Sequence, residues 1–353
     1  MSLRSFALAL AFCACLPVLA QEPNTPAEAF QQNLATQVAK AEGAKASVIP
    51  GANGWLFFVP ELRYLSVGPF WGDNAAKVSH ALSPEGADPL PAILDFKRQL
   101  DRIGVELLVV PVPAKAQIYP DDIAGDVITV AKNADPPRLD RDQTAFYAEL
   151  AKQGVKVLDL TPTFLKNRRS ATDGYLYCQQ DTHWSSRGCA LAAATIATAI
   201  NTRPWLKAIT KHKYTVASKT VAINGDMAEM NGAPKVSAET LKVAVVSEVK
   251  AGAKNPAGSW RQSPIVLLGD SHNLVFSTGG DMLVAGAGLP DHLARQLGFP
   301  VDVVAVRGSG ATPARVNLLR RGDKLAGKKL IIWCFTVREF TEGQGWRKVP
   351  IIK

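Results

Sequence analysis

The chain has 353 residues, of which 47% are hydrophobic and 20% charged, so it is long enough for one large globular domain or two small ones. Its formal charge of +9 favours an acidic polymer or an anionic lipid surface as partner, although a basic chain can also owe its charge to solubility alone. No nucleic-acid motif is present. No segment after residue 20 holds eighteen unbroken apolar residues, which argues against a later membrane span.

The first twenty residues have the pattern of an export signal. Arg4 supplies the positive start, residues 6–16 the apolar core, and Val18-Leu19-Ala20 a small-residue cleavage site. We therefore expect a periplasmic protein from which residues 1–20 are cleaved. Two alternatives stay open: the segment remains as an uncleaved inner-membrane anchor, or a lipid is attached at Cys13 or Cys15.

Residues 21–50 are polar and alanine-rich and predict a linker or a loose helix. From residue 51 onward, short β-branched runs alternate with segments of helical spacing, which is typical of a parallel sheet covered by helices on both faces. In the first half of the chain the expected strands are 54–59, 105–110 and 155–160, and the expected helices are 91–103 and 138–153.

The same alternation returns in the second half. A helix is expected over 186–200, strands over 265–268, 301–306 and 330–335, and helical segments at 291–297 and 313–321. Residues 205–260 are less regular and predict an inserted lobe, with turns at Asn224-Gly225 and Asn231-Gly232. We predict one α/β domain over residues 51–353 that this insertion interrupts.

The apolar run at 264–268 ends on Gly269-Asp270-Ser271-His272. Reactive groups in open parallel sheets lie beyond the carboxyl ends of the strands, which is where Ser271 falls. The glycine permits a sharp strand-to-helix turn, and the backbone N–H groups that follow can point toward a developing oxyanion. The pattern predicts a nucleophilic serine, although Gly-Asp-Ser alone often arises by chance.

The tetrapeptide Asp-Thr-His-Trp at 181–184 places a carboxylate two residues before an imidazole. Asp181 can hold the ring of His183 in one tautomer and stabilise the imidazolium that forms during proton transfer. Together with Ser271, these side chains supply a nucleophile, a base and an orienting acid. The competing interpretation is structural: Asp181 or Ser185 caps the helix that begins at 186, and His183 lies at the surface.

Two further interpretations of these motifs stay open. His272 is a rival base, but adjacent side chains on an extended strand point to opposite faces, so it is poorly placed to take the proton of Ser271. The pairs Asp181/His183 and Asp270/His272 are also of the kind that bind divalent metals. A metal-dependent hydrolase would lose its activity in a chelator; we predict no metal.

Cys178 and Cys189 lie on either side of the Asp181/His183 pair. In an oxidising compartment a disulfide between them would close a short loop and stabilise the fold by roughly 3 kcal/mol. Two unpaired thiols are an equally simple alternative. Cys334 lies in an apolar run and is expected in the core.

The order of the motifs, Asp-x-His first and Gly-Asp-Ser later, resembles that of the periplasmic alginate O-acetyltransferases, whose catalytic domain is SGNH-hydrolase-like with permuted motifs. Further matches cover roughly residues 50–341; they are 51–57, 111–115 with 118–120, and 333–335 with 338–340. No single motif is specific, but their number and order are. The resemblance implies an SGNH-hydrolase-like (flavodoxin-like) parallel sheet.

At the matching positions the resemblance implies that Ser271 is the nucleophile, His183 the base and Asp181 the orienting acid. It also implies an acetyl-serine intermediate and transfer to a hydroxyl of an exopolysaccharide such as alginate. A membrane-bound acyltransferase would be the acetyl donor, and other polysaccharide-secretion components would be partners. The asparagine of the usual SGNH oxyanion hole has no counterpart that we can locate, so we expect backbone N–H groups of Ser271, Gly308 and Gly310 to replace it.

Four basic residues flank the motif segments and are expected to face the carboxylates of an anionic exopolysaccharide: Lys115, Arg187, Arg307 and Arg338. Taken alone, each of these residues is more simply explained as a solvated charge at the surface. No Gly-rich nucleotide loop is present, so neither coenzyme A nor another cofactor is expected. Two rival functions remain, namely an acetylesterase that uses the same triad with water as acceptor, and a non-catalytic polysaccharide-binding scaffold of a secretion complex.

Overall fold

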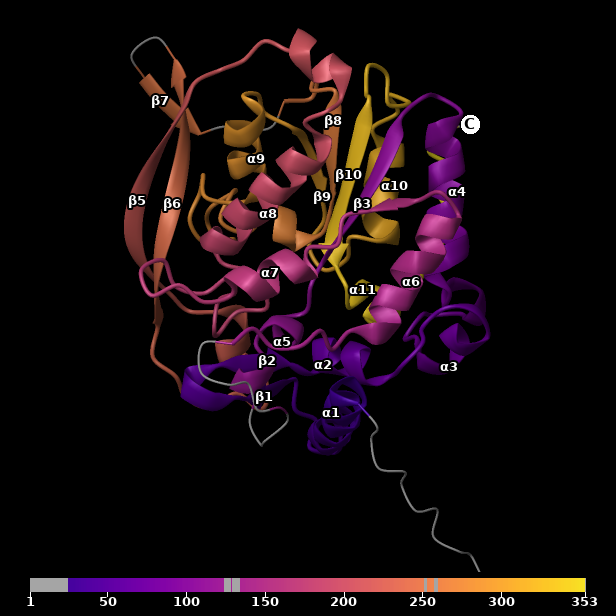
Figure 1. Cartoon of the computed structure of the whole chain (residues 1–353), viewed down its shortest axis with the longest axis vertical. Helices are drawn as coiled ribbons and strands as arrows, with labels where there is room; N and C mark the ends of the chain where they lie inside the picture. Colours follow the sequence, from indigo (N-terminus) through magenta and orange to yellow (C-terminus); the bar gives the residue numbers. More distant parts are fainter. Residues whose placement is uncertain (1–24, 124–127, 129–133, 251–252, 257–259, 353) are drawn as a thin grey trace, which may run out of the picture.

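The centre of the protein is a five-stranded sheet with the strand order β4-β3-β10-β8-β9, in which each neighbouring pair runs parallel (Figure 1). The computed structural model describes residues 25–123, 128, 134–250, 253–256 and 260–352, and the expected export signal at 1–20 lies outside them. The predicted α/β fold with a parallel sheet is confirmed. Its strands are β3 (Glu106–Val112), β4 (Lys156–Val157), β8 (Ile265–Gly269), β9 (Asp302–Ala305) and β10 (Leu330–Thr336).

The central strands are apolar on both faces because helices cover both faces. Successive side chains of a strand point to opposite sides, so Leu107 and Val109 of β3 join one buried cluster while Leu108 and Val110 join the other. On one face lie α4 (Pro89–Asp101), α6 (Arg141–Lys152) and α10 (Thr312–Arg320), and on the other α7 (Thr161–Asn167), α8 (Ser186–Ile200) and α9 (Leu289–Leu297) (Figure 1).

The segment expected as a linker or loose helix forms a packed helix, α1 (Pro26–Gly43). Its first turn is favoured by Pro26 and by Thr25, whose side chain accepts the backbone N–H of Glu28 at 3.2 Å. One face of α1 buries Phe30 and Leu34 in the same cluster as α8 and α9, and the helix packs against α2 (Val59–Ser66). Residues 26–43 are therefore part of the folded domain.

Two segments differ from the expected strand pattern. The strand expected at 54–59 does not join the main sheet; β2 (Leu56–Phe58) pairs with β1 (Val48–Pro50) in a separate antiparallel hairpin. The irregular stretch at 205–260 contains an antiparallel sheet that lies beside α8 and α9, away from the central sheet (Figure 1). Its strands are β5 (Tyr214–Ile223), β6 (Glu239–Lys250) and β7 (Ala253–Pro256).

Short helices complete the carboxyl end of the sheet. After β3 comes α5 (Lys115–Ile118), and after β10 comes α11 (Glu339–Glu342), while α3 (Ala75–Val78) lies before α4. Figure 1 shows α11 and α5 near the same end of the sheet, where the strand-to-helix connections gather. None of the helices in the described part of the chain combines the length and the hydrophobicity that a bilayer crossing requires.

Candidate active site

Ser271 lies immediately beyond the end of β8. A Cβ atom on Gly269 would come within 1.7 Å of the carbonyl oxygen of Cys334 on β10, so only glycine fits at this position. Asp270 then anchors the turn, because its carboxylate accepts the backbone N–H of His272 at 2.9 Å and that of Thr336 at 2.7 Å. The serine is thus fixed where two adjacent strands end.

The structure brings Ser271, His183 and Asp181 together. The hydroxyl oxygen of Ser271 lies 2.7 Å from Nε2 of His183, although 88 positions separate the two residues. On the far side of the ring, Oδ1 of Asp181 lies 2.6 Å from Nδ1. An ionised carboxylate can only accept, so we assign the ring proton to Nδ1, which leaves Nε2 to accept the proton of the serine hydroxyl.

The capping interpretation applies to Ser185 rather than Asp181. The hydroxyl of Ser185 accepts the backbone N–H of Gly188 at 3.2 Å and so caps α8. Asp181 instead turns back on its own loop, where Oδ1 also accepts the backbone N–H of His183 at 3.0 Å. This local bond holds the carboxylate against the imidazole.

Asp226 is a second carboxylate at this site, and the sequence reasoning did not find it. Its oxygens accept the backbone N–H of Thr182 at 2.7 Å and the hydroxyl of Thr182 at 2.5 Å, while its own backbone N–H donates to Oδ2 of Asp181 at 3.0 Å. A Cβ atom on Gly225 would lie 2.0 Å from the carbonyl oxygen of Gln180, so glycine lets the two segments approach. The Asn224-Gly225 turn is the only sequence signal near it.

The environment of His183 favours its protonated form. Burial lowers the pKa of His183, but the hydrogen bond and charge of Asp181, followed by the charge of Asp226, outweigh burial and raise that pKa above its ordinary value. Burial works against ionisation of Asp181 as well, yet its bond to His183 lowers the pKa of Asp181 to about 2. The carboxylate is therefore ionised near neutral pH and can stabilise an imidazolium.

His272 is placed differently from His183. Its Nδ1 lies 3.2 Å from Oδ1 of Asp270, its backbone carbonyl accepts the indole N–H of Trp184 at 3.0 Å, and burial lowers the pKa of His272 to about 4. It is a buried, neutral side chain that supports the serine turn. Trp184 is likewise buried and packs against its ring.

The acid and histidine atoms that come close enough to share a metal, among the described residues, belong to Asp181, His183 and Asp226 and lie within 4.8 Å of one another. Asp270 and His272, which the metal interpretation also needed, pair with each other instead. The Nδ1 of His183 already bonds Asp181, and both oxygens of Asp226 bond Thr182. These hydrogen bonds thus use the same atoms that a metal would need.

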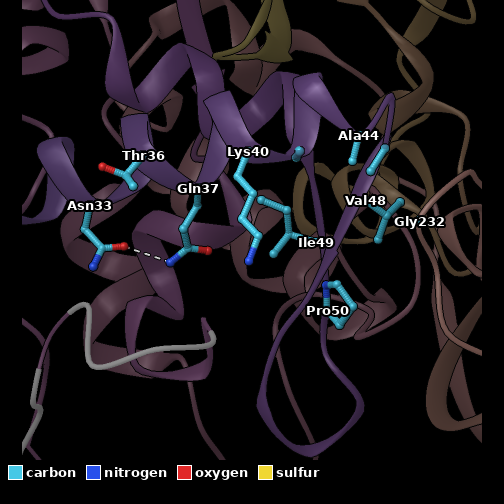
Figure 2. A pocket seen from close by; sticks show the side chains of 11 residues that line it. Asn33, Thr36, Gln37, Lys40, Ala44, Val48, Ile49, Pro50 and Gly232 are labelled. Atoms are coloured by element: carbon cyan, nitrogen blue, oxygen red, sulfur yellow. Dashed lines mark hydrogen bonds between the residues drawn. The ribbon is translucent and has the colours of Figure 1, made fainter.

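Ser271 and His183 open onto a cavity of about 430 Å³. Its apolar lining comes from Phe58, Pro60, Met230 and Met282, and its polar lining from Thr182, Asp226, Arg307, Gly308, Arg338, Glu339 and Glu342. A larger cavity, of about 610 Å³, lies between α1 and β1 (Figure 2). There the side-chain amides of Asn33 and Gln37 bond each other at 2.7 Å, and Lys40 lies beside Ile49 (Figure 2). None of the triad residues lines this cavity.

Arg307 and Arg338 are the two predicted substrate-binding residues that line the smaller cavity. Arg307 is exposed and forms a two-bond ion pair with the exposed Asp281. Arg338 is mostly buried; its guanidinium lies over the ring of Phe58 and donates to the hydroxyl of Thr336 at 3.3 Å. Both side chains thus line the wall of the cavity, Arg307 paired with Asp281 and Arg338 with Thr336 and, at 3.8 Å, with Glu61.

The prediction that Lys115 and Arg187 face substrate is corrected by their contacts. Lys115 is 2% exposed, and its ammonium donates to the carbonyl oxygens of Asp181 at 2.6 Å, Leu56 at 3.1 Å and Gln179 at 3.2 Å. Arg187 donates to backbone carbonyl oxygens of the loop at 167–174. Both cations hold loops in place, because their donors are already used by backbone carbonyl groups.

Lys115→Met is expected to lower the free energy of unfolding by about 3 kcal/mol or more, since three buried carbonyl oxygens lose their donor. Urea denaturation of the variant and the wild type measures the change. The matched control is Lys97→Met, whose ammonium pairs with Asp101 at the surface and whose loss is expected to cost under about 1 kcal/mol. Equal losses in the two variants would contradict the structural role of Lys115.

Two other expectations are corrected. Cys178 and Cys189 are both buried and free rather than disulfide-bonded, and the thiol of Cys178 points to the carbonyl oxygen of Trp184 at 3.8 Å. Gly310 does not line the cavity, because it packs under the site: a Cβ atom there would lie 2.6 Å from Phe335 and 2.9 Å from the backbone nitrogen of Asp270. Of the glycines expected at the oxyanion hole, Gly308 alone lines the cavity together with Ser271.

A doubly covered parallel sheet, with Ser271, His183 and Asp181 at the carboxyl ends of its strands, is the architecture of an SGNH-hydrolase-like protein. The family model described as "SGNH hydrolase-like domain, acetyltransferase AlgX" matches residues 48–337, so the chain belongs to this family. The predicted resemblance to the alginate O-acetyltransferase family is thereby confirmed.

Individual relatives agree with this assignment. The probable alginate O-acetylase AlgJ of Pseudomonas syringae pv. tomato is 29% identical over 141 residues, which are 40% of this chain and 34% of the relative, so the chain spans about a third of that protein. The AlgJ of Pseudomonas fluorescens is 25% identical over 69% of this chain and 59% of its own length.

Two solved structures share the fold. The O-acetyltransferase domain of Pseudomonas putida AlgJ superposes with a TM-score of 0.59 at 20% identity, covering 84% of this chain and 92% of the domain. AlgX of Pseudomonas aeruginosa gives 0.58 at 16% identity, covering 93% of this chain and 70% of AlgX.

Proposed function

We propose that this protein is an exported O-acetyltransferase that acetylates hydroxyl groups of an exopolysaccharide, alginate or a similar polymer. The observation that carries the proposal is the 2.7 Å contact between Ser271 and His183, with Asp181 on the far side of the ring. The membership in an acetyltransferase family supports the acyl chemistry. The periplasm is the proposed compartment, because residues 1–20 have the pattern of an export signal.

The geometry supports a two-step reaction. Ser271 Oγ attacks the carbonyl carbon of an acetyl donor while its proton passes to Nε2 of His183, and His183 then gives that proton to the departing donor group as the acetyl-serine ester forms. A sugar hydroxyl then attacks that ester and gives its proton to His183, which returns it to Ser271 Oγ as the acetylated sugar leaves. Asp181 stabilises the imidazolium in both steps.

The cavity supplies the other groups that this reaction needs. We assign oxyanion binding to the backbone N–H groups of Ser271 and Gly308, which line the same cavity. Arg307 and Arg338 are proposed to bind carboxylates of the acceptor polymer. The acetyl donor is proposed to be a membrane-bound acyltransferase, with other polysaccharide-secretion components as further partners.

The proposal is tested with purified protein and a chromogenic acetyl ester, with and without an acidic oligosaccharide acceptor. Mass spectrometry then shows where the acetyl group goes. Transfer to the sugar that depends on Ser271 establishes the transferase. Release of acetate alone identifies an esterase that uses the same triad, and glycan binding without any ester chemistry identifies a scaffold.

Asp226→Asn is expected to move the acidic limb of the kcat/KM profile to lower pH. Burial lowers the pKa of His183, whereas Asp181 and then Asp226 raise it, and Oδ2 of Asp226 lies 3.8 Å from Nδ1. Loss of this charge lowers the pKa of His183, so the neutral base is present at lower pH. Arg338, whose charge lowers the pKa of His183, and His272, whose neutral ring lies 4.8 Å from that of His183, are unchanged in the variant.

The measurement is a pH series of chromogenic ester hydrolysis for Asp226→Asn beside the wild type. Asp281→Asn is the matched control, because Asp281 is an exposed acid that pairs with Arg307. An unshifted acidic limb in Asp226→Asn, or an equal shift in the control, would show that the charge of Asp226 does not tune His183.

A further inference from the structure

Glu339 is a buried carboxyl group at the wall of the catalytic cavity that the triad does not use. It begins α11 two residues after Val337 and three after the end of β10, and only 4% of its surface is exposed. It lines the same cavity as Ser271, His183 and Gly308. A buried carboxyl group is costly unless its oxygens are hydrogen-bonded, so its contacts indicate its role.

The donors to Glu339 come from one loop. Oε2 accepts the hydroxyl of Ser309 at 2.6 Å and the backbone N–H of Ala311 at 3.3 Å. This loop, residues 307–311, joins β9 to α10 and carries Arg307 and Gly308 into the lining of the cavity. Gly308 has φ +88°, so regular secondary structure does not hold the loop at that residue.

The deeper side of the loop is held separately. The carbonyl oxygen of Gly310 accepts the indole N–H of Trp333 at 2.8 Å, and Gly310 packs against the backbone of Asp270. Glu339 therefore bonds the loop at Ser309 and Ala311, on either side of Gly310, and Ser309 directly follows Gly308 of the cavity lining.

We infer that Glu339 is a positioning residue that holds the loop of residues 307–311 so that the backbone of Gly308 stands beside Ser271. The inference rests on the proposed transferase function. Burial, aided by the charge of Asp270 and opposed by Ser309 and Arg338, raises the pKa of Glu339 to about 7. Both donors converge on one oxygen, so an amide oxygen at the same place can accept both bonds.

Three variants test the inference in chromogenic acetyl ester hydrolysis. Glu339→Ala is expected to lower kcat by about tenfold to a hundredfold, with KM within about twofold, because a displaced oxyanion donor weakens binding of the transition state only. Glu339→Gln is expected to recover most of this loss. Ser309→Ala, which removes one of the two donors, is expected to fall between the wild type and Glu339→Ala.

Hydrogen exchange of the peptide that contains residues 307–311 gives a readout that does not depend on turnover. Faster exchange is expected in Glu339→Ala, and near wild-type exchange in Glu339→Gln. If Glu339→Ala does not fold, Ser309→Ala carries the same comparison. Unchanged exchange in Ser309→Ala and Glu339→Ala, a loss confined to KM, or a Glu339→Gln as poor as the alanine variant would overturn the inference.

The proposed function fails in a different way. A wild-type protein without hydrolysis or transfer that depends on Ser271 would reject the transferase, whatever the exchange data give. If hydrogen exchange of residues 307–311 were faster in Glu339→Ala of such a protein, Glu339 would still be shown to hold the loop, but without a consequence for catalysis. The two failures are therefore read from separate measurements.

Discussion

Ser271→Ala is expected to lower kcat for acetyl transfer by about 10⁴-fold or more, to the residual rate that binding and oxyanion contacts alone provide. The reason is that the hydroxyl 2.7 Å from Nε2 of His183 is the only nucleophile assigned to the reaction. Acetyl-enzyme, which intact-mass spectrometry detects as a covalent adduct, should be absent from the variant. The side chain is small, so the fold should be retained.

The control for Ser271→Ala is Ser218→Ala, a change of the same chemistry on the exposed strand β5. Thermal unfolding of both variants separates loss of activity from loss of structure. Retained acetyl transfer in Ser271→Ala, or an adduct on another residue, would remove the serine from the mechanism and favour the scaffold or metal-dependent alternatives.

Asp181→Asn is expected to reduce kcat by about 10³-fold to 10⁴-fold. Its carboxylate accepts Nδ1–H of His183 at 2.6 Å, and an amide can present an N–H there instead. The ring would then carry its proton on Nε2 and could not accept the proton of Ser271. Because the hydrogen bond to His183 outweighs burial and holds the pKa of Asp181 at about 2, the wild-type acid is ionised throughout a neutral assay range.

The steady-state rate of Asp181→Asn is compared with that of Asp101→Asn, which alters an exposed acid paired with Lys97 on the opposite side of α4 from the core. Reaction of the serine with a fluorophosphonate probe provides a second measure of its nucleophilicity. Labelling of Asp181→Asn at the wild-type rate would contradict the assigned tautomer and leave the acid with a structural role only.

The elements around the site were predictable because their patterns are local. The apolar run that ends on Gly269 identified the strand before Ser271, and the alternation of strands with helices identified the sheet. The pairing of His183 with Ser271 was a hypothesis from residue chemistry, since no local pattern joins positions 88 apart. The serine and the acid–histidine segment could be named, but their contact required the fold.

Other features depend on contacts that no local pattern encodes. Asp226 reaches Thr182 from an irregular connection, and its role follows from the close approach of Gly225 to the backbone of Gln180. Lys115 looks like a surface charge in the sequence, yet three backbone carbonyl oxygens make its burial tolerable. The apolar face of α1 has helical spacing, but only the tertiary packing distinguishes a docked helix from a loose one.

The central place of β10 has a consequence for how the chain reaches its native state. β10 pairs with β3 on one side and with β8 on the other. The strand pairs β4-β3 and β8-β9 can therefore join into one sheet only when residues 330–336 are available to pair between them. Pairings of such long sequence separation slow folding, because loop closure comes before the contacts that stabilise it. Since the turn at Gly269 rests against Cys334, synthesis must pass that residue before the serine can take its active geometry.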